Sequence, residues 1–438
     1  MTRRQIHLAA FLIAGNGAHS HALWRHPETQ PGGFLSAGYY QEVARSVERG
    51  LFDLLFLADR LALSTRYGGS IEAGARHGDQ DATRLDPVPV LTTMAAVTSR
   101  LGLGATRSTT YADPYSLARA FATLDHLSGG RAAWNVVTSV NKGEAENFGL
   151  ESHLGHDERY DMADEFMEVA FGLWDSWAPD ALLLDRERGV YADPSRIREL
   201  NHCGRYFRSR GPLNIPRSPQ GRPVIIQAGS SGRGQEFAAR WAEVVFAIQP
   251  DPVRMRRFQV DLRDKAERQG RGDAPPKALA AVMPFVGRSR AEAEELRERH
   301  NALVDPTVGL STLSSHTDFD FSTLPPDRPV GELEVGGMQG LFALVRSLSR
   351  EGVTLAEIGR RYGASVLVPQ IAGTAAEVAD VLQSWFEAEA CDGFVVSPAH
   401  LPRGFDAFVD GVVPELQRRG LLRRAYTGAT LREHLRDV

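Results

Sequence analysis

Residues 101–139 read LGLGATRSTTYADPYSLARAFATLDHLSGGRAAWNVVTS. An apolar run at 101–105 is followed by a helix-like segment at 114–127 and then by a second apolar run at 131–137. Pro114 stands in the first turn of that helix, where its missing N–H removes no intrahelical hydrogen bond. Two strands joined by a crossover helix run parallel, so this stretch predicts one β-α-β unit.

The same alternation continues on both sides of this unit. Six further apolar runs are predicted as strands, at 7–14, 52–58, 224–227, 244–248, 280–286 and 393–396. The clearest of the other helices are predicted at 37–49, 87–98 and 160–177. An open, doubly wound sheet more often stops at five or six strands. Eight alternating strands therefore predict an α/β fold, the closed TIM (β/α)₈ barrel, with residues 1–438 as a single domain.

Four segments are too long to be ordinary connections between a strand and a helix. They cover about 60–86, 138–159, 189–219 and 302–364. The segment at 189–219 is a polar, extended excursion, whereas the other three follow a strand directly or come shortly before the last strand. Barrel enzymes build their sites at the C-terminal face from such loops. We therefore expect these three insertions to form the walls and lid of a site.

Composition argues against several classes of function. The net charge of −5 provides no basic field for a nucleic acid. No window approaches the roughly 18 consecutive apolar residues of a membrane span. The two cysteines, Cys203 and Cys391, make neither a disulfide framework nor a metal knuckle. The apolar run at 6–14 is short and leads into Gly-Asn-Gly at 15–17 rather than a cleavage site, which favours a first strand in a cytoplasmic protein.

Polar side chains stand where the predicted strands end. Those after the first five strands are amides, hydroxyls, imidazoles and a carboxylate, namely Asn16, His19, His21, Asp59, Thr106, Asn135, Ser139 and Gln227. This set lacks the paired carboxylates of a glycosidase and the elbow-type nucleophile of a hydrolase. It suits a polar, planar ligand that carries a phosphate.

A phosphate site is predicted where the fifth strand leads into its helix. Residues 228–232 read AGSSG, and backbone amides, serine hydroxyls and glycines at a helix N-terminus bind anions. An N-cap serine followed by a turn glycine would give the same pattern without a ligand. His156 and Tyr160 begin another helix and could reach the same phosphate, although a solvated helix start also explains them.

Longer segments match one family in order along nearly the whole chain. They are LGATRSTTY at 103–111, DPYSLAR at 113–119, LDHLSGGR at 124–131, WNVVTS at 134–139, GAHSHALWR at 17–25, FLAD at 56–59, NFG at 147–149, LWDSW at 173–177, PVIIQAG at 223–229 and LSSHT at 313–317. The sequence resembles the nitrilotriacetate, pristinamycin-synthase and dibenzothiophene-sulfone monooxygenases of the luciferase-like flavin superfamily.

The resemblance implies FMN at the C-terminal face of the barrel. The residues that it implies for FMN binding are Asp59, Thr106, Asn135, Ser139, His156, Tyr160, Gly229, Ser230 and Ser231. It also implies a two-component system, in which a separate NAD(P)H:FMN reductase supplies the reduced flavin, FMNH2. Reduced FMN and O2 would form a flavin C4a-(hydro)peroxide that oxidises a small organic substrate, a sulfone, thioether or aminocarboxylate. The family expectation is a homodimer or homotetramer, and no metal is implied.

Three histidines are candidate acid–base groups, His19, His21 and His316. An imidazole near the flavin could stabilise a peroxide anion or give it a proton. The sequence does not decide between His19 and His21, and a loop histidine such as His316 would ordinarily lie at the surface. Four aromatic residues are candidate walls that exclude water from the substrate pocket, although ordinary barrel core would explain them equally well: Phe11, Trp24, Phe56 and Phe246.

Two other activities fit parts of the pattern. His19-Ser20-His21 after the first strand is also the metal motif of amidohydrolase-type barrels. The ends of the later strands, where such an enzyme needs further ligands, carry Asn135, Gln227, Gln249 and Ser397. Deazaflavin (F420)-dependent oxidoreductases share the superfamily but transfer hydride without oxygen, and a non-catalytic relative is a third alternative. The TRSTTY segment at 106–111 and the long insertions favour the FMN-dependent branch.

Overall fold

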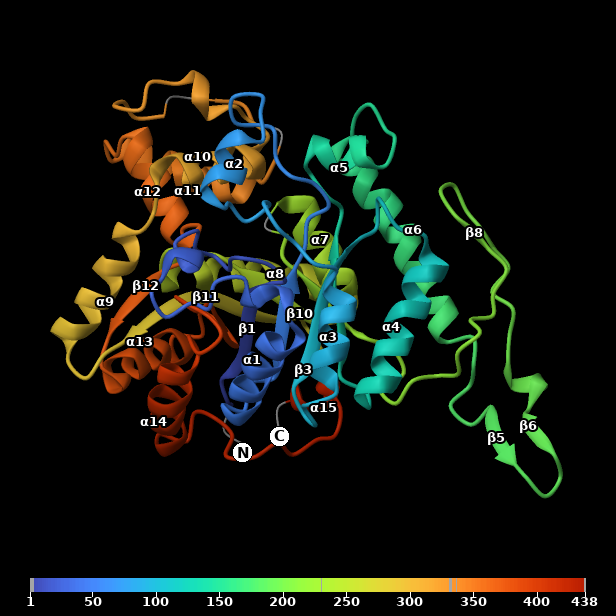
Figure 1. Ribbon diagram of the computed structural model, residues 1–438. Coiled ribbons are helices and arrows are strands. Elements are labelled where there is room, and N and C mark those ends of the chain that lie inside the picture. The colour runs from blue at the N-terminus through green and yellow to red at the C-terminus, as the bar shows by residue number, and fades with distance from the viewer. Residues whose placement is uncertain (1–3, 230, 331–332, 336, 437–438) are drawn as a thin grey trace.

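The computed structural model describes residues 4–229, 231–330, 333–335 and 337–436. Eight parallel strands form a closed ring. Figure 1 shows this barrel from the side, with helices packed around it. In ring order they are β1 (His7–Ile13), β2 (Leu54–Ala58), β3 (Gly102–Ser108), β4 (Ala132–Val137), β9 (Val224–Gln227), β10 (Val244–Ala247), β11 (Lys277–Val286) and β13 (Gly393–Val396). Pairing of β13 with β1 closes the ring. The predicted barrel is confirmed.

One further parallel strand lies outside the ring. β12 (Gln370–Gly373) pairs with the last residues of β11, in a register that places Gln370 opposite Met283. This strand was not predicted from the sequence. β11 begins at Lys277, three residues before the predicted start, and β3 continues to Ser108, beyond its predicted end at Ala105.

Helices cover the outside of the ring. They are α1 (Ala37–Arg49), α3 (Pro87–Ala95), α4 (Pro114–Ser128), α6 (His156–Trp174), α7 (Gly232–Trp241), α8 (Pro252–Arg268), α9 (Arg290–Ala302), α13 (Ala375–Glu387), α14 (Val413–Arg418) and the short α15 (Leu431–His434). The predicted helix at 160–177 begins four residues earlier, at His156, and ends at Trp174. Within the described ranges, no helix has the length and apolarity needed to cross a membrane.

Alternation along the strands separates two layers of core. Phe11 lies opposite Phe56 across β1 and β2. Phe56 belongs to the cluster inside the barrel, and the partly buried Phe11 packs against it. Their neighbours Leu12 and Leu57 belong to the larger cluster that packs the strands against the outer helices. Since successive side chains of a strand point to opposite faces, every second residue of each strand is available to the interior.

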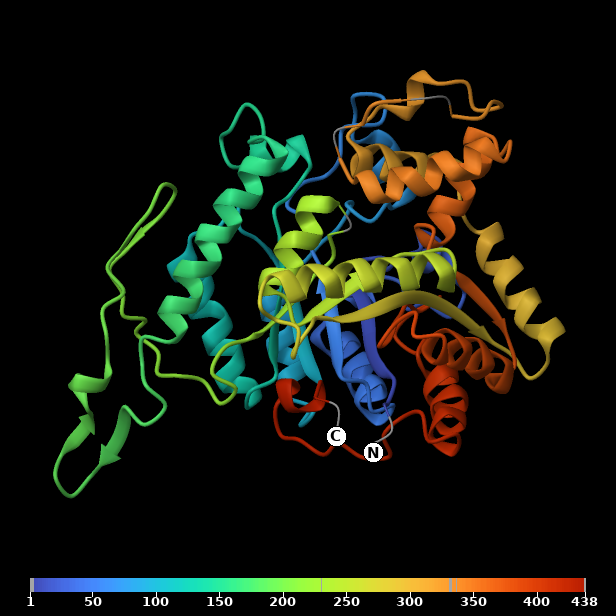
Figure 2. The same cartoon turned by 180° about the vertical axis from the view of Figure 1, so that it is seen from behind.

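The three insertions expected at the C-terminal face all lie there. They contain α2 (Glu72–His77), α5 (Lys142–Asn147), α10 (Pro306–Thr317), α11 (Gln339–Arg350) and α12 (Leu355–Ser365). These helices lie at one end of the barrel, and the chain termini lie at the other (Figures 1 and 2). α10 and α12 touch backbone to backbone where Gly309 faces the carbonyl of Gly359, so a side chain at Gly309 would collide with α12.

The polar excursion forms two antiparallel hairpins, from β5 (Leu182–Asp185), β6 (Val190–Ala192), β7 (His202–Cys203) and β8 (Arg208–Ser209). They project sideways from the barrel, beyond α6 and on the side away from α9 and α12 (Figures 1 and 2). Because β5 begins at Leu182, the excursion begins earlier than the predicted residue 189.

A buried ion pair holds the opposite end of the barrel together. Asp53, directly before β2, accepts hydrogen bonds from Arg423 at 2.5 Å, from His7 Nδ1 at 3.2 Å and from the backbone N–H of Leu8 at 2.8 Å. Burial by itself raises the pKa of Asp53, but Arg423 and His7 outweigh burial and lower that pKa to about 2. The carboxylate thus joins two strands to the C-terminal segment.

We predict that Asp53→Asn lowers the free energy of unfolding by about 3 kcal/mol, because it leaves the buried guanidinium of Arg423 without its counter-charge. Urea unfolding at pH 7.5 measures this change. Asp410→Asn is the matched control, because it removes an exposed pair with Arg49 and should cost less than about 1 kcal/mol. Equal costs for the two variants would contradict the role of Asp53.

Candidate active site

An amide with an unused acceptor lies at the mouth of the barrel. Thr106 on β3 and Asn135 on β4 lie side by side in the sheet, and Asn135 Nδ2 donates to Thr106 Oγ1 at 3.0 Å. Asn135 Oδ1 is buried and has no hydrogen-bond partner among the described residues. Leaving a buried acceptor unpaired costs about 1–3 kcal/mol, so this oxygen is placed to receive a donor from a ligand.

Two serines that follow Thr106 and Asn135 in the chain lie at the same side of the barrel mouth. Ser139 Oγ lies 3.0 Å from Ser108 Oγ, and both side chains are buried. Ser139 has a φ of 55°, in the left-handed region that non-glycine residues rarely adopt. Such strain, of order 1–3 kcal/mol, is typical of residues whose position serves a site.

Asp59 contributes a carboxyl group to the same end of the barrel. Its side chain is only 8% exposed and lies 3.7 Å from Arg107, and Oδ1 accepts the backbone N–H of Arg60 at 2.9 Å. Burial raises the pKa of Asp59 to about 6, although Arg84 and Arg107 oppose that rise. This carboxyl group therefore changes between its protonated and ionised forms only slightly below neutral pH.

The residues predicted for a phosphate come together at the start of α7. Ser231 is the N-cap of this helix, and its Oγ accepts the N–H of Gly234 at 3.0 Å. A Cβ on Gly234 would lie 2.8 Å from the Tyr160 hydroxyl, which places that phenol against the helix start. The ring of His156 lies 5.3 Å from that of Tyr160. The N–H groups of a first helical turn have no intrahelical acceptors, so the cradle can bind an anion.

Gly229 and Ser230 were also predicted to bind the phosphate, and the structure describes only Gly229. Gly229 donates its N–H to Gln227 Oε1 at 2.5 Å, which ties the turn to the end of β9. Ser230 lies outside the described residues.

His19 packs against the aromatic side chains inside the barrel mouth. Its ring stacks on Phe11 with centroids 3.6 Å apart, Phe11 contacts Phe56 at 5.7 Å, and Phe56 contacts Phe246 at 5.1 Å. His19 Nδ1 is hydrogen-bonded to the hydroxyl of Ser397, directly after β13. Burial lowers the pKa of His19 to about 3, so the imidazole is neutral at physiological pH.

His21 turns away from His19 and into the helical insertion. Its Nδ1 lies 3.0 Å from the carbonyl oxygen of Gly363 and its Nε2 lies 2.5 Å from Thr312 Oγ1. Because a carbonyl only accepts, Nδ1 carries the hydrogen and Nε2 accepts from the threonine. Burial lowers the pKa of His21 to about 4. Both ring nitrogens of His21 are therefore used in hydrogen bonds that hold the loop after β1 against the helical insertion.

Comparisons with known proteins decide the family. A model of the luciferase-like monooxygenases matches residues 18–388. The chain belongs to the luciferase-like monooxygenase family. It is 51% identical to a dibenzothiophene-sulfone monooxygenase of Rhodococcus erythropolis (strain XP), over 99% of this chain and 97% of that one. It is 41% identical to the N-acetyl-S-(2-succino)cysteine monooxygenase of Bacillus subtilis (strain 168), over 99% and 96%.

Solved structures agree with this assignment. The crystal structure of DmoA from Hyphomicrobium sulfonivorans superposes with a TM-score of 0.92 at 37% identity, covering 98% of this chain and 92% of that one. An F420-dependent secondary alcohol dehydrogenase superposes with a TM-score of 0.58 at 15% identity, over 94% and 99%, which shows a shared fold alone. This protein is a monooxygenase of the luciferase-like family.

His316 of this luciferase-like monooxygenase is not the surface histidine that its loop position suggested. It lies on α10, is buried, and its Nδ1 is 2.5 Å from the Tyr362 hydroxyl of α12. Burial and the charge of Arg60 hold the pKa of His316 well below its ordinary value. The insertion that was expected to supply a wall or lid of the site is a packed helical layer of α10 and α12.

Trp24 is not part of the aromatic group formed by Phe11, Phe56 and Phe246. It is 43% exposed and lines a different pocket together with Phe34. Its loop is long enough to reach past the barrel mouth, and no pattern in the sequence shows where the loop turns.

A buried ionic network was missed by the sequence analysis. Asp81 accepts from Arg60 at 3.3 Å, from Arg84 at 3.0 Å and from the hydroxyl of Ser315 on α10 at 2.8 Å. These residues come from two insertions more than 200 positions apart, so no short motif could have marked them. The network ties the segment 60–86 to the helical layer above the barrel.

No metal centre is formed by the described part of the chain, where no three His, Cys, Asp or Glu side chains group as ligands. His19 and His21 are bonded to different elements, β13 and the helical insertion. The His-x-His motif therefore has a structural explanation in this luciferase-like monooxygenase.

We predict that His21 makes stability depend on pH. The unfolded chain protonates this histidine near pH 6.5, whereas the folded chain does so only near 4, so the folded state loses free energy as pH falls below 6.5. Between pH 7.5 and 5.0, wild type should lose about 2 kcal/mol more than His21→Gln, whose amide can make both hydrogen bonds. Denaturant unfolding at the two pH values measures the difference.

The control for this experiment is His126→Gln, which replaces an exposed histidine. Its loss of stability should match that of wild type. A His21→Gln variant with the wild-type pH dependence would show that His21 titrates as it does in the unfolded chain.

Proposed function

We propose that this luciferase-like monooxygenase uses reduced FMN as the electron donor and O2 as the oxygen source. The proposal rests on two features that lie at the same end of the barrel. One is the buried oxygen of Asn135, which has no hydrogen-bond partner among the described residues, and the other is the anion cradle formed by Tyr160 and Ser231. A flavin mononucleotide offers an N–H donor on its ring and a phosphate on its side chain, so both features find a partner in the same molecule.

The donor set of the barrel mouth fits FMN. Asp59, Thr106, Asn135 and Ser139 would hold the ring and the ribityl chain, and His156, Tyr160, Gly229, Ser230 and Ser231 would hold the phosphate and the adjoining ribityl hydroxyls. The phosphate group needs no metal here, because the helix N-terminus and the phenol supply donors. When bound, reduced FMN supplies two electrons to O2, so that one oxygen atom enters the substrate and the other leaves as water.

The protein residues control water and protons around that reaction. Phe11, Phe56 and Phe246 make an apolar wall that keeps water from the reacting atoms. His19 is neutral and held through Nδ1, so its Nε2 is available to give or take a proton. His21, with both nitrogens engaged, supports the loop instead. We assign the acid–base role to His19, with His316 as the second candidate.

We infer that a separate NAD(P)H:FMN reductase delivers the reduced flavin, and that the protein acts as a homodimer or homotetramer. Its substrate is a small organic molecule of the sulfone, thioether or aminocarboxylate type. The 51% identity to a dibenzothiophene-sulfone monooxygenase makes aromatic sulfones the first compounds to test.

We expect oxygen uptake when reduced FMN, O2 and a substrate of this type are combined. The assay is an oxygen electrode with reduced FMN from a flavin reductase, run against sulfones, thioethers and aminocarboxylates, with mass spectrometry of the product. Reduced F420 without oxygen is the comparison. Turnover with reduced F420 and none with FMNH2 would overturn the proposal.

We predict that Gly234→Ala raises the Kd for FMN about tenfold, because its Cβ would lie 2.8 Å from the Tyr160 hydroxyl and 3.0 Å from Ser231 Oγ. Flavin fluorescence titration measures this change. Gly38→Ala in α1 is the control, since a Cβ there meets its nearest neighbour only at 4.0 Å. An unchanged Kd in Gly234→Ala would place the phosphate elsewhere.

We predict that His316→Ala leaves the affinity for FMN unchanged but uncouples oxygen use from product formation. Hydrogen peroxide released per O2 consumed, measured with a peroxidase-linked assay, should rise several-fold. His434→Ala is the control, because it also removes a buried histidine side chain and leaves a cavity of similar size, but at the opposite end of the barrel. Normal coupling in His316→Ala would remove this histidine from the reaction.

A further inference from the structure

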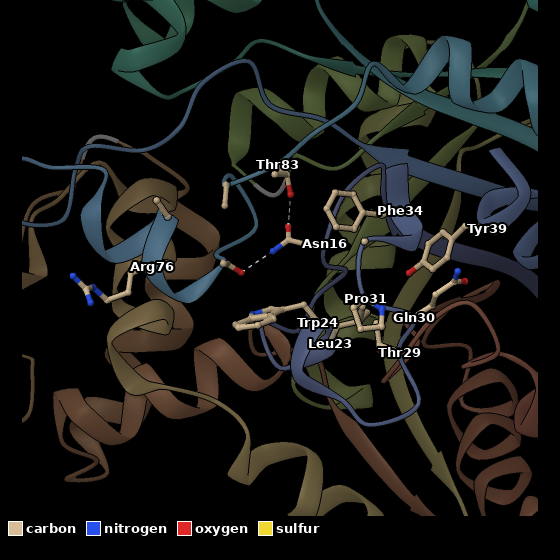
Figure 3. A pocket seen from close by; sticks show the side chains of 14 residues that line it. Asn16, Leu23, Trp24, Thr29, Gln30, Pro31, Phe34, Tyr39, Arg76 and Thr83 are labelled. Carbon is tan, nitrogen blue, oxygen red and sulfur yellow. Dashed lines mark hydrogen bonds between the residues drawn. The ribbon is translucent and has the colours of Figure 1, made fainter. Parts of the chain in front are cut away.

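A second pocket lies at the same end of the barrel as the site described above, but other residues line it. It has a volume of about 280 Å³ and lies between the loop after β1 and the insertion that contains α2 (Figure 3). Its walls include Leu23, Trp24, Phe34 and Tyr39. None of the residues proposed to hold FMN lines it, so it is not an extension of the flavin site.

The polar groups of the pocket wall hold the two loops in place. Asn16 Nδ2 donates to the carbonyl of Gly78 at 3.0 Å, and Asn16 Oδ1 accepts from Thr83 Oγ1 at 3.0 Å, as Figure 3 shows. The indole Nε1 of Trp24 donates to the carbonyl of His77 at 3.0 Å. These groups are already paired, so the pocket exists before any ligand arrives and a ligand loses little free energy in ordering it.

Tyr39 is the exception. The residue is only 4% exposed and lines the pocket, and its hydroxyl oxygen is not among the fully buried polar atoms that the described residues leave without a partner, so this oxygen is open to the pocket rather than enclosed. In Figure 3 the hydroxyl points to the side of the pocket where Gln30 and Pro31 lie. Burial raises the pKa of Tyr39, so the hydroxyl keeps its proton and remains a donor.

Charge and size restrict what could bind. Arg76 carries the one formal charge among the lining residues, and it is exposed and paired with Glu72 at 2.8 Å. The rest of the wall is apolar or amide and hydroxyl groups, which favours an uncharged ligand. Pockets for drug-sized molecules start at about 300 Å³, so this one suits a molecule with a single ring. Trp24, 43% exposed, offers its indole face to such a ring.

We propose that this pocket is a second ligand site, which takes an uncharged single-ring organic molecule whose oxygen accepts a hydrogen bond from Tyr39. The ring packs between Trp24 and Phe34, and the acceptor oxygen receives a hydrogen bond from the Tyr39 hydroxyl, which keeps its proton. The site is independent of the function proposed above. Part of its wall, Asn16, Leu23 and Trp24, belongs to the loop that carries His19. A bound molecule therefore contacts the segment that holds the candidate acid–base group.

Acetophenone, one ring with one carbonyl oxygen, is a probe of the required shape. Its binding is measured by isothermal titration calorimetry on the full-length protein saturated with FMN, and by quenching of tryptophan emission. Wild type should bind acetophenone, and Tyr39→Phe should raise the Kd about fivefold. Ala75→Phe, which fills the pocket from α2, should abolish this binding, whereas Ala75→Ser should retain it. Trp24→Phe should remove the quenching.

Tyr426→Phe is the matched control for Tyr39→Phe, because it removes a phenol that donates to the carbonyl of Phe52 at the opposite end of the barrel. Its Kd for acetophenone should equal that of wild type. No binding to wild type overturns the proposal. Equal binding by Ala75→Phe and wild type also overturns it, because the probe would then occupy another place. Neither result depends on oxygenase activity, so a failure here is separate from a failure of the FMN proposal.

Discussion

Closure of the parallel ring is the constraint on which the rest of the structure depends. β13 pairs with β1 as β1 pairs with β2, so the eight strands leave no open edge in the ring. Closure fixes the register, and the register decides which side chains meet. Phe11 faces the interior beside Phe56, and Thr106 lies beside Asn135, although each pair is separated by many residues of chain. The candidate site is a consequence of this pairing.

Burial at the mouth of the barrel determines the protonation of its groups. It holds His19 and His21 neutral and raises the pKa of Asp59 to about 6, because a charged form is disfavoured away from water. A neutral imidazole can both donate and accept, which a permanently charged one cannot. The same exclusion of water that shifts these pKa values is what an oxygen-transferring flavin requires.

The insertions do more than cover the site. His21 is bonded to Gly363 and Thr312, and Asp81 is bonded to Ser315, so the loops after β1 and β2 are each fastened to the helical layer of α10 and α12. The loop that carries His19 therefore has its position set from both sides, by Ser397 inside the barrel and by the insertion outside it.

The sequence alone determined the ring, because alternating apolar strands and crossover helices have one compact closed solution at eight repeats. It also determined which polar residues stand at strand ends, and in the structure Thr106 lies beside Asn135, while Tyr160 and Ser231 both lie against Gly234 at the start of α7. Only the tertiary structure separated His19 from His21, moved Trp24 to another pocket and placed His316 in a packed helix. Those outcomes depend on long loops, whose backbones carry no periodic pattern and are positioned by contacts with residues far away in the chain, such as Thr312 for His21 and Tyr362 for His316.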